Sequence, residues 1–336
     1  MKRAFILFYF IIVTYGLFGQ ASTYVKYYNE LGRTYQGVPD GGGNYYFLQA
    51  DKNTSLTSIF KLNEHGVKIA ESEKLSSGEP GSDFLVLYGS TEIALVMSGT
   101  GTSIRYYDEN LIFQEEHYLL QADTMEILKV AASQNRMVFL FAGQSGKYYL
   151  GYATSRTNLD WIIDLPDGSH SVFRKFSLSI NNDGKVLVGY SSNLFGLYDS
   201  TGNKLWGGNY PFREVSGFTE NNFYIKLGSQ LNKISFNSGI IWEKTLDYSN
   251  SGLLERLDSE RLFFGIETDS NFVYTIYDSS GTKISGSVIN HKQDSKSIKV
   301  NGEYVYVQGN KGIMKIHEEL PFRGLYTYFL SSKFTP

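Results

Sequence analysis

The feature that most constrains the fold of this chain is a unit of four short strands that recurs along most of its length. Each unit begins with a half-buried strand and a polar turn, continues with an apolar strand and a strand ending near Asp or Asn, and finishes with a glycine turn and a last strand. The turn before the last strand is the clearest landmark, and it occurs at Gly66, Asn110, the region of Thr157 and Asn158, Gly202, Gly239, Gly281 and the region of Glu318 and Glu319. These landmarks follow one another at intervals of about 36 to 46 residues. The chain is therefore a repetition of one supersecondary unit.

Within each unit, runs of β-branched and aromatic residues are separated by Gly, Asn, Asp and Ser, which predicts strands and turns rather than helices. Several runs, such as Phe84–Tyr88 and Met137–Phe141, are apolar at every position. That pattern is typical of strands buried on both faces. The six Pro residues in the chain are few enough for a largely β-sheet protein.

A pitch of about 40 to 45 residues with four strands per unit is typical of a β-propeller blade. We therefore predict an all-β fold, a β-propeller of seven four-stranded blades, with six or eight blades as alternatives. A two-domain β-sandwich and a β-helix are the other architectures that we considered. Because a single blade leaves both sheet faces apolar, the ring has to close on itself. The strand that closes it is either Tyr24–Tyr28 or Leu325–Leu330.

The N-terminus has the pattern of a secretory signal peptide. Lys2 and Arg3 precede the uncharged run Ala4–Leu17, which is too short to span a bilayer as a helix. Small residues around position 20 place cleavage after Ala21, with cleavage after Gln20 or an uncleaved anchor as alternatives. We predict a signal peptide at residues 1–21, a single propeller domain at residues 22–336 without a membrane span, and a secreted or periplasmic location.

The composition excludes several classes of function. The chain has no cysteine, so it has no disulfide, no thiolate nucleophile, no cysteine-ligated metal and no lipid-anchored cysteine. The formal net charge is −3, which argues against a nucleic-acid partner. With 42% apolar and 19% charged residues, the chain can bury a core without disulfides.

Three segments carry a family likeness. The segment Leu197–Trp206, in which an apolar strand ends in Asp-x-x-Gly followed by Trp, resembles the blade motif of PQQ-like (quinoprotein-type) propellers, and Phe236–Trp242 is a weaker copy. The turn at Pro39–Phe47 resembles secreted propeller repeats of Bacteroidetes-type bacteria. The resemblance implies a structural role, packing between blades, for the motif residues, which are Gly66, Trp161, Gly202, Trp206, Gly239, Trp242 and Gly281.

The resemblance also suggests a quinone-dependent enzyme, which the sequence does not support. Such enzymes typically have eight blades and often a vicinal disulfide over the cofactor, and this chain has no cysteine. The five histidines have no metal-ligand spacing, and no serine-hydrolase motif is present. We therefore predict no cofactor, no metal site and no catalytic residue.

Paired tyrosines offer a different lead, because adjacent residues of a strand point to opposite faces. One member of each pair, for example Tyr45 and Tyr46, could reach a ligand, although packing between blades is the other interpretation. We predict an exported non-catalytic binding or scaffold module for a protein or glycan partner. The alternative is a carbohydrate-active hydrolase or lyase, whose carboxylates would converge in the central funnel.

Overall fold

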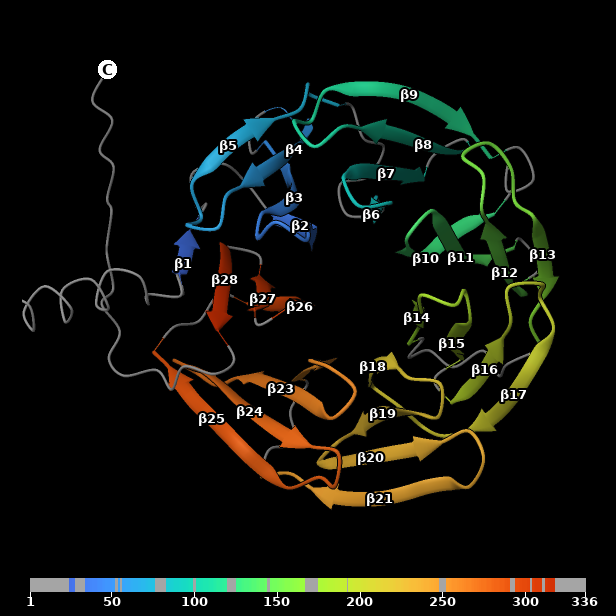
Figure 1. Ribbon diagram of the computed structural model, residues 1–336, viewed down its shortest axis with the longest axis vertical. Coiled ribbons are helices and arrows are strands. Elements are labelled where there is room, and N and C mark those ends of the chain that lie inside the picture. The colour runs from blue at the N-terminus through green and yellow to red at the C-terminus, as the bar shows by residue number, and fades with distance from the viewer. Residues whose placement is uncertain are drawn as a thin grey trace, which may run out of the picture.

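The computed structural model of the protein is a seven-bladed β-propeller in which every blade is a four-stranded antiparallel sheet (Figure 1). The structure describes residues 24–27, 34–51, 54, 56–75, 83–98, 101–119, 125–143, 146–166, 175–191, 193–247, 252–290, 294–302, 304–309 and 312–317. The predicted fold class and the count of seven blades are both confirmed. Among the described residues no helix is long and apolar enough to cross a membrane.

The blades follow the chain in order. Blade 1 consists of β2 (Thr34–Pro39), β3 (Tyr45–Ala50), β4 (Thr57–Leu62) and β5 (Lys68–Glu71). Blade 2 consists of β6 (Phe84–Tyr88), β7 (Glu92–Ser98), β8 (Thr102–Tyr107) and β9 (Phe113–Tyr118). Blade 3 consists of β10 (Glu126–Ser133), β11 (Arg136–Ala142), β12 (Tyr148–Ala153) and β13 (Trp161–Asp164). Blade 4 consists of β14 (Ser177–Ile180), β15 (Val186–Tyr190), β16 (Leu194–Tyr198) and β17 (Lys204–Asn209).

The remaining blades repeat this order until the ring closes. Blade 5 consists of β18 (Glu214–Phe218), β19 (Asn222–Leu227), β20 (Gln230–Ser235) and β21 (Gly239–Thr245). Blade 6 consists of β22 (Gly252–Arg256), β23 (Arg261–Glu267), β24 (Phe272–Asp278) and β25 (Lys283–Ile289). Blade 7 consists of β26 (Ser295–Asn301), β27 (Tyr304–Gly309), β28 (Gly312–His317) and β1 (Tyr24–Tyr27).

The N-terminal strand closes the ring. β1 is the outermost strand of blade 7 and pairs antiparallel with β28, with Tyr24 opposite Lys315 and Tyr27 opposite Gly312. Of the two segments predicted for this role, the N-terminal segment Tyr24–Tyr28 is confirmed by the pairing of Tyr24–Tyr27, the part of it that the structure describes. The competing segment, Leu325–Leu330, lies outside the described residues. Blade 7 is thus assembled from both ends of the chain.

The core lies between the blades rather than within one of them. The middle strands are covered on both faces, so that every residue of β3, β4 and β15 is buried. One apolar cluster joins Val86 and Tyr106 of blade 2 to Phe139 of blade 3, and similar clusters join other neighbouring blades. Near-continuous apolar strands are therefore a consequence of neighbours on both sides.

This packing decides the role of the paired tyrosines. Tyr45, Tyr46, Tyr106 and Tyr107 are all at most 1% exposed, so neither member of these pairs reaches solvent. Tyr45 stacks on Tyr306 of the preceding blade, with ring centroids 4.9 Å apart. The idea that one member of each pair contacts a ligand is wrong for these two pairs, because both faces of a middle strand are covered by neighbouring blades.

The two ends of the ring differ in the turns that they carry. We call the end with the first and third turn of each blade the hairpin face; for blade 1 these turns join β2 to β3 and β4 to β5. The opposite end, with the second turn and the connections to the next blade, is the crossover face. The first strand of each blade is innermost and lies nearest the axis of the ring (Figure 1).

Candidate functional site

The glycines singled out from the repeat occupy the third turns of their blades, on the hairpin face. Gly66, Gly202, Gly239 and Gly281 all have φ between 70° and 86°, a conformation that strains residues with a Cβ. The turn of blade 4 is held by Asp199, whose Oδ1 accepts the backbone N–H groups of Thr201 and Asn203 at 2.9 Å each. Asp278 does the same in blade 6. Carboxylate capping and glycine conformation together explain the repeated Asp-x-x-Gly pattern.

The outer-strand tryptophans lie against the next blade. Trp161 on β13 donates its indole N–H to the carbonyl oxygen of Ser200 in blade 4 at 2.8 Å, and Trp242 on β21 donates to that of Ser279 in blade 6 at 3.0 Å. A Cβ built on Gly202 would lie 3.3 Å from the Trp161 ring, and one on Gly281 would lie 3.2 Å from the Trp242 ring. These tryptophans therefore rest on the glycine turns of the following blades.

Trp206 on β17 packs differently. Its ring meets Phe236 and Phe223 of blade 5 edge-on, with centroids 5.1 and 5.8 Å away, and stacks on Tyr210. Gly239 belongs to the same joint, because a Cβ there would lie 3.3 Å from the Tyr210 hydroxyl. All three tryptophans thus lie at joints between consecutive blades.

Lysines link further blades through the same turns. Lys61 of blade 1 donates to the carbonyl oxygen of Glu109 in blade 2 at 2.8 Å, and Lys233 of blade 5 donates to that of Ser279 in blade 6 at 2.9 Å. Both lysines occupy the strand position directly before the β-bulge of their blade. Lys315 of blade 7 donates to the carbonyl oxygen of Glu64 in blade 1 at 3.0 Å, across the closure of the ring. The hairpin face is therefore held by main-chain acceptors at corresponding turns.

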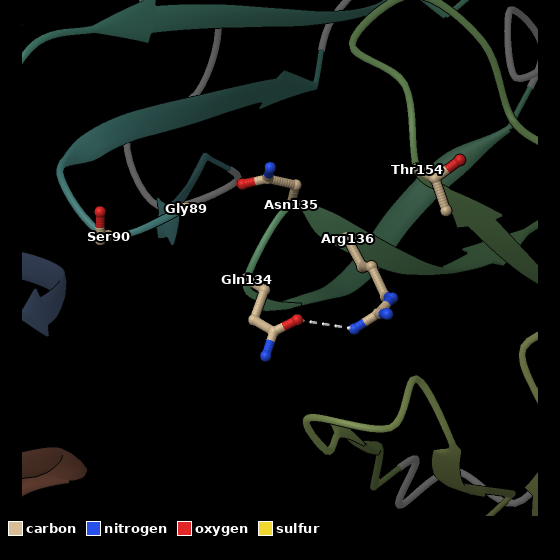
Figure 2. Close-up of a pocket in the computed structure, with 6 residues that line it drawn as sticks. All are labelled: Gly89, Ser90, Gln134, Asn135, Arg136 and Thr154. Atoms are coloured by element: carbon tan, nitrogen blue, oxygen red, sulfur yellow. Dashed lines mark hydrogen bonds between the residues drawn. The ribbon is translucent and has the colours of Figure 1, made fainter.

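A pocket opens on this face between blades 2 and 3 (Figure 2). Its volume is about 500 Å³, and the residues that line it are Gly89, Ser90, Gln134, Asn135, Arg136 and Thr154. The first two lie in the β6–β7 turn, the next two in the β10–β11 turn, Arg136 begins β11 and Thr154 follows β12. The lining presents hydroxyl, amide and guanidinium groups, which are hydrogen-bond donors and acceptors.

The pocket wall is held rigid by bonds between the turns of three blades. The Gly89 N–H donates to the Gln134 carbonyl at 2.7 Å, which ties blade 2 to blade 3. Gln134 itself has a φ of 53°, an uncommon conformation for a residue other than glycine. The Arg136 guanidinium donates through Nη1 to Gln134 Oε1 at 3.0 Å and to the Asn182 carbonyl of blade 4 at 2.9 Å, and the first of these bonds is drawn in Figure 2. The guanidinium therefore has one defined orientation beside the pocket.

Charged groups support the same joint from outside the lining. Arg156 of blade 3 donates through Nη2 to both carboxylate oxygens of Glu92 in blade 2, at 2.7 Å each, and also pairs through Nη1 with Glu115. Its guanidinium lies 4.8 Å from the centre of the Tyr106 ring. Hydrogen bonds from Arg156 and then from His117 hold the pKa of Glu115 below its usual value. These ion pairs hold blades 2 and 3 together beside the pocket.

Two carboxyl groups with raised pKa values lie on the crossover face, one in blade 2 and one in blade 5. Asp83, directly before β6, is 3% exposed, and burial raises its pKa to about 6 although the Ser98 backbone N–H works against the rise. Burial also raises the pKa of Glu214, at the start of β18, against the opposing charges of Lys226, Arg213 and Lys175. The main influences on both groups are burial, cations and main-chain N–H groups. Within the described ranges, no three His, Asp or Glu side chains are grouped closely enough to hold a metal ion.

The pocket residues were not singled out from the sequence. Ser133–Arg136 and Tyr88–Ser90 are polar turns between apolar strands and look like many other turns of the chain. No local sequence pattern marks these residues as a site, because the two turns are about 45 residues apart in the sequence and become neighbours only in the folded ring. His170 and His291 lie outside the described residues.

Comparison with known proteins shows that this chain shares its fold with solved structures but assigns it to no family. Neither the models of known protein families nor the sequences of characterised proteins match this chain. Among solved structures, BamB from Moraxella catarrhalis is similar with a TM-score of 0.54 at 12% identity, covering 83% of this chain and 82% of BamB. Virginiamycin B lyase from Staphylococcus aureus has a TM-score of 0.60 at 14% identity, covering 87% and 99% of the two chains. A catalytically inactive variant of that lyase with quinupristin has a TM-score of 0.62 at 13% identity, covering 88% and 98%. At these identities the likeness shows the propeller fold alone.

Proposed function

We propose that this protein is an exported, non-catalytic binding module built of PQQ-like blades, and that it holds a glycan segment in the pocket between blades 2 and 3. The observation that carries the proposal is the lining, in which Ser90, Gln134, Asn135 and Thr154 supply neutral hydrogen-bonding groups and Arg136 supplies one fixed cation. A polyhydroxylated ligand both donates and accepts hydrogen bonds, and such mixed groups match it. A protein loop is the other partner class, and the binding experiment separates the two.

The rigidity of the wall supports binding with little reorganisation. The hydrogen bonds of Arg136 and the Gly89–Gln134 backbone bond hold the site in shape before a ligand arrives. Preorganisation of this kind lowers the entropy lost on binding. The lining residues include no carboxylate, imidazole or amine, the groups that usually transfer protons in hydrolases and lyases. This composition favours binding over the alternative of a carbohydrate-active enzyme at this site.

Export is the second part of the proposal. The ring-closing strand begins at Tyr24, so cleavage after Ala21 would leave the strand complete at the start of the mature chain. An intact β1 is needed because blade 7 takes its fourth strand from this end. The location is periplasmic or extracellular, where a propeller without cysteine folds independently of redox conditions.

The test is a binding screen of residues 22–336 against an array of defined bacterial oligosaccharides and a matched array of peptides. We expect a glycan hit whose affinity is lost in the variants Ser90→Ala and Asn135→Ala, because both exposed side chains line the pocket. The matched control is Asn221→Ala, an exposed Asn in the corresponding turn of blade 5. A hit on peptides alone would refute the glycan assignment, and a glycan hit unchanged in both pocket variants would refute the site.

A further inference from the structure

The guanidinium of Arg136 is the charged group in the lining of the pocket between blades 2 and 3. It uses Nη1 for both of its hydrogen bonds, to Gln134 Oε1 at 3.0 Å and to the Asn182 carbonyl oxygen at 2.9 Å, and the first is drawn in Figure 2. A guanidinium has further N–H groups on Nε and Nη2. Among the described residues these two nitrogens have no partner, and neither of them is buried. One edge of the guanidinium is therefore open to a ligand.

The charge of Arg136 is also unpaired, in contrast to that of the other arginine at this joint. Arg156 pairs with both Glu92 and Glu115, so its charge is already balanced within the protein. Arg136 makes no ion pair with any carboxylate in the described part of the chain. The pocket thus contains a cation whose counter-ion the described residues do not supply.

The stem of the Arg136 side chain is held by the neighbouring turn of blade 4. Gly184 in the β14–β15 turn has a φ of 80°, and a Cβ built on it would lie 3.4 Å from Arg136 Cδ and 2.6 Å from the Tyr152 hydroxyl oxygen. Tyr152 is 1% exposed, and its hydroxyl has no hydrogen-bond partner among the described residues. The guanidinium is thus positioned by its stem and by Nη1, and its open edge keeps one orientation before a ligand binds.

Two exposed carboxylates in nearby turns limit where an anionic group can bind in the pocket. Asp160 accepts the backbone N–H of Thr154 through Oδ2 at 2.8 Å, which disfavours an anion at that wall. Asp183 follows Asn182 in the blade 4 turn and makes no ion pair with Arg136. The charged group of a ligand therefore belongs at the open edge of Arg136, and its neutral part belongs at the uncharged lining residues.

We infer that the pocket selects an acidic glycan, and that Nε and Nη2 of Arg136 bind the carboxylate of a uronic acid unit. Two parallel N–H···O bonds from one edge of a guanidinium match the planar geometry of a carboxylate. The single cation of the lining balances one negative charge, whereas a phosphate monoester carries about two. The inference rests on the proposed function, because it names the class of glycan for the same pocket.

The experiment uses residues 22–336 and oligomers of glucuronic, galacturonic and mannuronic acid, each beside its carboxyl-reduced form, in which CH2OH replaces the carboxylate. By titration calorimetry we expect at least one uronate oligomer to bind about tenfold or more tightly than its reduced form, the gain typical of hydrogen bonds between charged groups. If the protein binds glycans but no uronate oligomer more tightly than its reduced form, the inference is overturned and the proposed function stands. If it binds no glycan, both are refuted.

Variants of Arg136 separate a direct contact from support of the pocket wall. In Arg136→Gln we expect the Kd of the uronate oligomer to weaken about tenfold more than that of the reduced form, because only the first loses a charged partner. Arg136→Lys keeps the charge without the planar fork and should recover part of this difference, and it takes the place of Arg136→Gln if that variant does not fold. The control is Arg213→Gln, the same charge change at an exposed residue on the crossover face, which should leave both Kd values unchanged. Equal weakening of both ligands in the folded Arg136 variant would overturn the inference.

Discussion

The buried carboxyl of Asp83 contributes to the stability of this propeller with a pH dependence opposite in sign to that of carboxyls whose pKa folding lowers, such as Glu115. Asp83 is 3% exposed, its Oδ1 has no hydrogen-bond partner among the described residues, and burial raises its pKa from 3.8 to about 6. The folded protein therefore holds this proton more tightly than the unfolded chain does. The contribution of Asp83 to stability is largest below pH 3.8, falls as the pH rises toward 6, and stays low above it.

The size of the effect follows from the two pKa values. A gap of about two pKa units corresponds to about 3 kcal/mol of folding free energy lost at pH 8. In Asp83→Asn the side chain cannot ionise, and its oxygen can still accept the Ser98 N–H. Its buried amide N–H groups cost about 1 kcal/mol if they find no partner. We therefore expect the variant to be more stable than the wild type by about 2 kcal/mol at pH 8, and less stable by about 0.5 kcal/mol at pH 4, where ionisation of the unfolded chain has already removed part of the wild-type contribution.

Urea unfolding at pH 4 and pH 8, followed by fluorescence, measures this reversal in the relative stability of the variant and the wild type. The control is Asp183→Asn, an exposed residue in the β14–β15 turn of blade 4, for which we expect the same difference from the wild type at both pH values. If Asp83→Asn shows no pH-dependent difference from the wild type, the carboxyl ionises as it does in water. The argument from burial would then be wrong.

Three further predictions concern the blade motif and the N-terminus. Gly202→Ala should lower the free energy of unfolding by about 1 to 2 kcal/mol, because alanine is strained at a φ of 86°, whereas Gly41→Ala should change it by less than about 0.5 kcal/mol; equal effects in thermal unfolding would contradict this. Trp242→Phe should cost about 1 kcal/mol through loss of its hydrogen bond to the next blade, and a neutral result would show that the bond contributes nothing. Mass spectrometry of the exported protein should find Ser22 as its first residue, and a chain that retains residues 1–21 would refute the signal peptide.

Much of the fold could be predicted from the sequence, because its determinants are local. The interval between turns, the apolar runs and the Asp-x-x-Gly pattern predicted strands, blades and their number. Blade 2 shows the limit of the pattern. The position that holds glycine in blades 1, 4, 5 and 6 is occupied there by Leu111, with a φ of 64°, and not by the Asn110 that marks the turn in the sequence. Leu111 is 3% exposed and packs in the core, which offsets the backbone strain.

The sequence by itself determined that this chain forms a ring of repeated sheets, since strand alternation and turn chemistry act over a few residues. Only the tertiary structure decided which terminus closes the ring, which tyrosines are buried, and which polar turns border a pocket. It also brought Gly89 and Gln134, 45 positions apart in the sequence, within hydrogen-bonding distance of each other. The physical reason is that a closed ring makes neighbours of residues from different blades, and no local pattern in either blade records the other.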